Sequence, residues 1–205
     1  MTVARLLRSR RAASAIEFAL VAPLLIFLLF GVIDGGRWLW EVNRSEKATQ
    51  AGARFAVVTD PVTSGLVTAD YMGVGGLTQG DVIPKSAFGK VVCGSGGCCS
   101  GNLTCTSPYP ALGTFDSSAF QRIVDRMAAM NPEITAANVR ISYAGSGLGY
   151  AGDPDPNRMD VSPLVTVELT GLQFRPLFLA SMAGFTMPSF ATTLTAEDSD
   201  GNQSN

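Results

Sequence analysis

The pattern of apolar and polar residues divides the chain near position 34. Residues 18–33 carry no charge, and Glu17 is the only charged residue between positions 12 and 33. A helix needs about 20 mostly apolar residues to cross the hydrocarbon core of a bilayer. The run therefore predicts a transmembrane helix over residues 13–33, with one carboxylate close to its first turn.

A second helical pattern continues directly from the apolar run. Apolar and small residues recur at three- and four-residue spacing over residues 34–58, and most charged residues lie on another face. Trp38 and Trp40 are typical of the aromatic belt where a helix leaves a membrane. The pair Asp60-Pro61 predicts the end of the helix, because the residue before a proline disfavours helical backbone.

The sequence from 59 to 198 predicts a small α+β head. Residues 59–115 are rich in Gly, Ser, Thr and Pro, and they are expected to form loops with one or two short strands. A one-sided apolar pattern predicts a helix over residues 116–130, which Asp116 or Ser117 can cap. Alternating apolar and polar positions predict strands at residues 139–143 and 165–170.

The C-terminal part is apolar but interrupted. Residues 172–197 contain no long uncharged run free of Pro and Gly, so a second membrane span is not expected. A strand ending in Phe174, a short helix or loop and a last strand near residues 191–196 fit better. Residues 199–205 are expected to be a disordered tail. The fold class is therefore α+β: a long N-terminal helix followed by a small antiparallel-sheet extracytoplasmic head.

Charge predicts the orientation in the membrane. Residues 1–12 form a basic leader with four arginines, and basic residues stay on the cytoplasmic side. The N-terminus is then cytoplasmic and the head extracytoplasmic.

The leader is the only basic cluster and the formal net charge is −2, which argues against a nucleic-acid partner. Histidine, the commonest general base and metal ligand, is absent, so neither an enzyme nor a cofactor is expected.

Four cysteines lie close together in the loop region 93–105. They are Cys93, Cys98, Cys99 and Cys105. Outside the cytoplasm four cysteines commonly form two disulfides. Two pairings are open: Cys93–Cys98 with Cys99–Cys105, or Cys93–Cys99 with Cys98–Cys105. A zinc site would need closer cysteine spacing or histidine, and a redox site would need Cys-x-x-Cys, so the disulfides are interpreted as staples of a Gly-rich loop.

One acidic loop has oxygen ligands at calcium-like spacing. Asp153, Asp155, Asn157 and Asp160 alternate along it, but Arg158 occupies the position where a calcium loop needs glycine. The prolines of this segment account for a loop without any ion. No metal is therefore expected.

The N-terminal sequence resembles a known family. Residues Arg10-Arg-Ala-Ala-Ser-Ala-Ile-Glu-Phe-Ala-Leu-Val-Ala-Pro-Leu-Leu25 are similar to the N-terminus of TadE-like minor pilins of the tight-adherence (Tad/Flp) pilus system. The family also tends to follow its helix with a motif similar to Gly31-Val-Ile-Asp-Gly-Gly-Arg37. The resemblance covers about the first 58 residues, and beyond them only the general layout is shared.

The resemblance implies a processing site and a docking site. A prepilin peptidase would cut between Ala12 and Ala13, although the family usually has Gly where this chain has Ala12. Cleavage would place Glu17 fifth in the mature chain and change the formal net charge from −2 to −6. Glu17 and Phe18 would then dock against a neighbouring subunit, whose new α-amino group at Ala13 supplies a cation for the carboxylate.

Two functions follow as hypotheses. The favoured one is a minor pilin or pseudopilin of a type IVb pilus used in bacterial adhesion, held in the inner membrane with a periplasmic head. Its partners would be inner-membrane lipid, the prepilin peptidase, other pilins and Tad secretion and assembly proteins. The alternative is an uncleaved single-pass envelope protein with a ligand-binding or enzymatic periplasmic domain.

Overall fold

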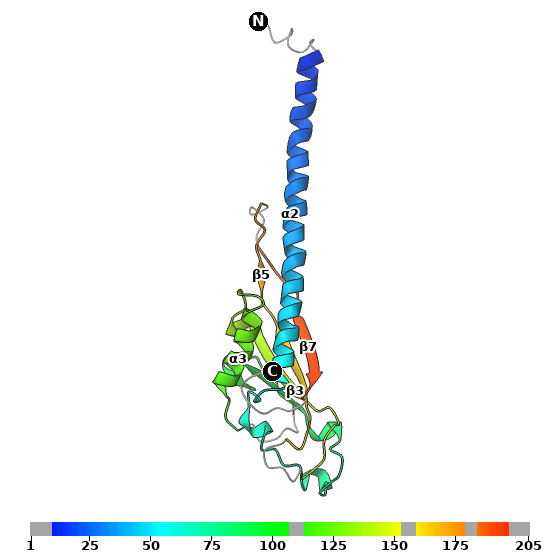
Figure 1. Cartoon of the computed structure of the whole chain (residues 1–205), viewed down its shortest axis with the longest axis vertical. Helices are drawn as coiled ribbons and strands as arrows, with labels where there is room; N and C mark the ends of the chain where they lie inside the picture. Colours follow the sequence, from blue (N-terminus) through cyan, green and yellow to red (C-terminus); the bar gives the residue numbers. More distant parts are fainter. Residues whose placement is uncertain (1–9, 107–112, 153–158, 179–183, 197–205) are drawn as a thin grey trace. The chain divides into compact units, whose positions relative to one another are not determined.

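The chain forms one long helix, a five-stranded sheet and a two-stranded arm (Figure 1). The computed structural model describes residues 10–106, 113–152, 159–178 and 184–196. Two compact units share the long helix. The N-terminal unit contains residues up to Val42 together with Gln173–Phe185, and the sheet unit contains Asn43–Leu172 and the residues from Thr186 onward. Residues 173–185, which the sequence assigned to the head, thus group with the N-terminal helix.

Helix α2, Arg10–Ala56, is continuous through Pro23. Long runs of Leu and Ala favour helix, and the proline removes only one backbone donor from an otherwise regular element. The helix ends two residues before the expected Val58. There the Thr59 hydroxyl donates to the Phe55 carbonyl at 2.8 Å and satisfies one of the last helical acceptors.

The sheet is antiparallel between all neighbouring strands, in the order β2-β1-β3-β4-β7. Its strands are β1 (Lys90–Gly94), β2 (Gly97–Cys98), β3 (Val139–Ala144), β4 (Leu164–Leu169) and β7 (Phe190–Thr195). The strands predicted at residues 139–143, 165–170 and near 191–196 lie within one residue of β3, β4 and β7 at each end. Short 3-10 helices connect the elements at Ser64–Leu66, Val74–Gly76, Lys85–Ala87 and Ala136–Asn138.

The register of the sheet places its apolar residues on one face. Ile141 lies opposite Val167, and Tyr143 lies opposite Val165, because β3 and β4 pair without a bulge. Opposed residues share a face, so these side chains form one buried layer. The other face is polar, as the 2.7 Å contact between the Thr166 and Thr193 hydroxyls shows.

Helix α3, Ser117–Ala128, packs in the same unit and begins at a capped turn. The Asp116 carboxylate accepts from the backbone amides of Ser118 at 2.8 Å and Ala119 at 2.9 Å. Hydrogen bonding by the Ser118 side chain, followed by the Ala119 amide, holds the pKa of Asp116 below its usual value. The apolar face of α3 is buried, at Ala119, Phe120, Ile123, Val124 and Met127.

The C-terminal half of α2 packs against both α3 and the sheet through small residues. A Cβ atom on Gly52 would lie 2.7 Å from Met127 Cγ and 3.4 Å from Val167 Cγ1. Two polar contacts hold α2 to the residues that directly follow α3. The Arg44 guanidinium donates to the Met130 carbonyl at 2.7 Å, and the Asn131 amide donates to the Ser45 hydroxyl at 3.3 Å.

The two-stranded arm belongs to the N-terminal unit. Strands β5 (Gln173–Phe174) and β6 (Phe185–Thr186) pair with each other, and β5 runs beside α2 in Figure 1. The rings of Phe174 and Phe185 pack with their centroids 5.3 Å apart. The α+β class expected from the sequence, a long apolar helix with a small antiparallel sheet, is confirmed.

A larger side chain at position 52 should destabilise the sheet unit. Gly52→Leu is expected to lower the free energy of unfolding by about 1–3 kcal/mol, the usual range for an overpacked core. The measurement is hydrogen–deuterium exchange of the β4 amides in the full-length protein in detergent. Gln50→Leu introduces the same side chain at an exposed position of the same helix. Equal exchange in the two variants would contradict the close packing.

Candidate functional site

The N-terminal half of α2 presents an apolar surface. The span that could cross a membrane begins at Ser14, and its most apolar window has a mean hydropathy of 2.6 with none of it buried. Among residues 14–33 only Ala22 and Phe30 are half-buried, and the rest are exposed. An uncovered apolar surface of this length is typical of a membrane-anchored helix or of a buried interface.

Glu17 lies at the start of this surface. Its side chain is exposed, and within the described part of the chain it has no hydrogen-bond or ion-pair partner. Phe18 beside it is 75% exposed. Ala12 and Ala13 lie in the first turns of α2, and their side chains are outside the described structure. The proposed docking residues are thus uncovered within one copy of the chain.

A second carboxylate, Asp34, stands at the other end of the apolar run and is buried. Asp34 is only 4% exposed. Oδ1 accepts from the backbone amide of Leu177 at 2.8 Å, and Oδ2 accepts from that of Phe178 at 3.1 Å. One carboxylate therefore holds two consecutive amides of the arm, and charged acceptors make strong hydrogen bonds.

Arg37 and two aromatic pairs complete this contact. The Arg37 guanidinium lies 3.5 Å from Asp34 Oδ1 and 5.7 Å above the centre of the Phe174 ring. One helical turn before Asp34, the ring of Phe30 stacks on that of Phe178, with centroids 4.6 Å apart and planes 6° apart. The arm thus follows α2 from Arg37 back to Phe30.

Sequence reasoning did not find this contact. Asp34 and Arg37 were noted only as part of a motif similar to one in the resembled family. Leu177 and Phe178 lie 143 and 144 residues after Asp34 in the chain, and no local pattern indicates such a pairing. The available signal was a lone acid directly after an apolar run, since a carboxylate at that place needs a partner.

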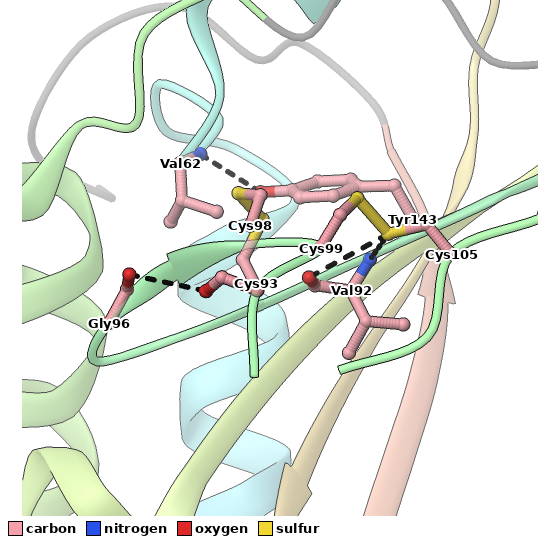
Figure 2. The surroundings of a disulfide bond; sticks show 9 residues. Val62, Val92, Cys93, Gly96, Cys98, Cys99, Cys105 and Tyr143 are labelled. Atoms are coloured by element: carbon pink, nitrogen blue, oxygen red, sulfur yellow. Dashed lines mark hydrogen bonds between the residues drawn. A yellow bond between two sulfur atoms is a disulfide. The ribbon is translucent and has the colours of Figure 1, made fainter. Parts of the chain in front are cut away.

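The cysteines form two disulfides, Cys93–Cys98 and Cys99–Cys105 (Figure 2). This is one of the two pairings that the sequence left open. Cys93 and Cys98 lie opposite each other on β1 and β2. The Val92 amide donates to Cys105 Sγ at 3.1 Å, so the second disulfide folds its loop back onto β1.

Tyr143 connects the sheet to the loop after α2. Its hydroxyl accepts from the Val62 amide at 3.0 Å, as Figure 2 shows. Burial raises the pKa of Tyr143 far above its usual value, so the phenol stays neutral. Its role there is structural.

The acidic loop considered for calcium is described only in part. Asp153, Asp155 and Asn157 lie outside the described residues. Asp160 is buried, and its Oδ2 accepts from the amides of Tyr71 and Gly152, each at 2.9 Å. Burial, and then the charge of Asp160, raise the pKa of Tyr71. This carboxylate therefore ties two loops together.

A shallow pocket adjoins the disulfide loop. Its volume is about 260 Å³. Small-molecule sites usually measure about 300–1,000 Å³ and are mostly apolar. The pocket lies below that range, and Arg140 is the charged residue in its wall. The lining residues are Gly94, Ser95, Gly96, Ser100, Gly101, Leu103, Ala137, Val139 and Arg140.

Comparison with known proteins bears on α2. Residues 12–54 match the sequence model of the family described as TadE-like protein. The helix is TadE-like. The matched segment lies wholly inside Arg10–Ala56, so the TadE-like part of the chain is the apolar helix and its continuation. No curated protein and no solved structure matches the chain.

The TadE-like match confirms the resemblance found in the sequence. This match over residues 12–54 suggests a component associated with the Tad pilus. The length and apolar surface of the TadE-like helix fit a membrane-anchored component.

Removing the Asp34 carboxylate should loosen the arm. In Asp34→Ala the amides of Leu177 and Phe178 lose their acceptor, and a hydrogen bond to a charged group contributes about 1.5–3 kcal/mol. Their hydrogen–deuterium exchange, measured on the full-length protein in detergent, should become about tenfold faster or more. Glu17→Ala, which removes the carboxylate at the other end of the apolar run, should leave both amides unchanged. Unaltered exchange in Asp34→Ala would show that the contact does not hold the arm.

Proposed function

We propose that the protein is a minor pilin or pseudopilin of the Tad pilus, with a structural rather than an enzymatic role. The observation that carries this proposal is the exposed apolar surface of the TadE-like helix with the exposed carboxylate of Glu17 at its start. The α2 helix spans the bacterial inner membrane before assembly. The basic leader stays in the cytoplasm, and the sheet unit lies in the periplasm.

Glu17 is the residue that this role requires. An ionised side chain in a membrane segment is costly, by roughly 2.5–3.5 kcal/mol at the bilayer centre for Asp, Lys or Arg and less near the edge, and such residues mark functional sites. Cleavage between Ala12 and Ala13 creates an α-amino group one helical turn away. The amine of a neighbouring copy, displaced by about 6 Å along the helix axis, pairs with Glu17 and fixes the stagger between subunits.

The exposed aromatic ring of Phe18 belongs to the same apolar surface. In one copy of the chain it is 75% exposed, and most of the apolar run is exposed as well. Lipid covers this surface before assembly, and the helices of neighbouring pilins cover it in the filament. Prepilin peptidase and the Tad assembly proteins are the further partners of this pathway.

The first test is the N-terminal residue of the mature protein. Mass spectrometry of the membrane fraction is expected to find a chain that begins at Ala13. In cells without the prepilin peptidase the chain should retain its arginine-rich leader. A chain that retains the leader in both strains would leave Glu17 without its amine partner. The protein would then be an uncleaved anchored envelope protein.

The second test is Glu17→Ala. The variant should enter the membrane as well as the unmodified protein, because it removes a charge from an apolar run, but pili should be lost or strongly reduced. Piliation is counted by electron microscopy, and insertion is checked by alkaline extraction of membranes. The matched control, Glu46→Ala, removes an exposed carboxylate from the same helix outside the apolar run and should form normal pili. Normal piliation in Glu17→Ala would overturn the docking role.

A further inference from the structure

We propose that residues 176–178 of the arm insert into the outer leaflet of the membrane beside α2, as a second and shallow membrane contact. The occupant of their exposed apolar surface is the lipid bilayer. The inference rests on the proposed membrane span of α2. It assigns a lipid contact to a part of the chain that lies outside the TadE-like segment.

The arm has an apolar surface that the protein leaves uncovered. Leu177 is 60% exposed and Phe178 is 43% exposed. No charged residue occurs between Pro176 and Ala196, whereas Arg175 and Gln173 precede that stretch and are exposed. The arm therefore changes from polar to apolar between Arg175 and Pro176.

This boundary on the arm is level with the boundary on the helix. On α2 the uncharged run ends at Ile33, and the first charged residue after it is Asp34. Asp34 holds the amides of Leu177 and Phe178 at 2.8 and 3.1 Å, directly beyond the polar-to-apolar change of the arm. Two segments far apart in the sequence thus pass from polar to apolar at the same height.

The stacked rings place the arm inside the apolar layer. Phe178 stacks on Phe30, which lies within the uncharged run of α2. Asp34 lies four positions after Phe30 on the helix, a rise of about 6 Å. Segments that lie in a membrane interface bury their apolar face by about 5–10 Å. A span over residues 14–33 would be about 30 Å long, so Phe178 lies at this depth in the outer leaflet.

The hydrogen bonds of Asp34 satisfy two backbone amides of the arm that would otherwise enter the bilayer without an acceptor. Non-helical backbone entering a bilayer leaves amides without water, and each unsatisfied group costs several kcal/mol. Asp34 accepts from the two amides at the entry point, and Arg37 balances its charge from the polar side. Trp40, exposed further along the helix, lies where aromatic side chains favour the interface.

Photocrosslinking tests the proposal on the full-length protein in vesicles of phosphatidylethanolamine and phosphatidylglycerol. The photoreactive residue p-benzoylphenylalanine replaces Leu177 in one variant, Leu24 in a second and Tyr150 in a third. All three side chains are exposed, and Tyr150 is an aromatic residue of the sheet unit. Mass spectrometry then identifies adducts with lipid and adducts with protein.

Lipid adducts are expected at position 177 at a level comparable with position 24, and none above background at position 150. Protein adducts at 177 without lipid adducts would identify a second copy of the chain as the occupant and overturn the proposal. Labelling at 24 with none at 177 would do the same while leaving the membrane span intact. Absence of lipid adducts at 24 would remove the span itself, and the arm proposal with it.

A companion variant tests the part played by Asp34. Asp34→Ala combined with the photoreactive residue at position 177 should lose most of its lipid adducts, because the entering amides lack their acceptor. The same substitution should not change labelling at position 24. Undiminished labelling at 177 would show that the arm reaches lipid without Asp34, and it would overturn the assigned role of this carboxylate.

Discussion

The carboxylate of Asp34 is the contact on which the N-terminal unit depends. It is buried at the end of an apolar run, and it holds the two backbone amides through which the arm approaches the helix. Without this acceptor the amides would remain unsatisfied next to hydrocarbon side chains, and the stacked rings of Phe30 and Phe178 would lose their alignment. Asp34 joins two parts of the chain that the sequence keeps far apart.

The carboxylates at the two ends of the apolar run have opposite environments. Glu17 is exposed, and the described part of the protein offers it no partner. Asp34 has partners from both the helix and the arm. The physical rule is the same for both, since a charge beside apolar surface needs a counterpart. For Asp34 the counterpart lies in the same chain, whereas for Glu17 it is proposed to come from another subunit.

The sequence predicted those features that local patterns determine. Charge and hydropathy identified α2, and alternation located β3 and β4 almost to the residue. The cysteine spacing limited the disulfides to two pairings, but the choice between them depends on β1 and β2 facing each other across a turn. The arm was not foreseen, because its place beside α2 depends on hydrogen bonds across more than 140 residues. The close packing at Gly52 was not foreseen either, because a glycine has no side chain from which its contacts could be predicted.

The order of strands along the chain has a consequence for biosynthesis. Strand β7 is the last strand of the sheet to be synthesised, and its partner β4 has an open edge until β7 arrives. The arm immediately precedes β7, so the sheet is completed only after the arm has been made. A nascent or truncated chain that stops before the arm therefore exposes the backbone donors and acceptors of β4, which are a template for pairing with another chain. The edge of β4 is therefore closed by β7 directly after the arm has been synthesised.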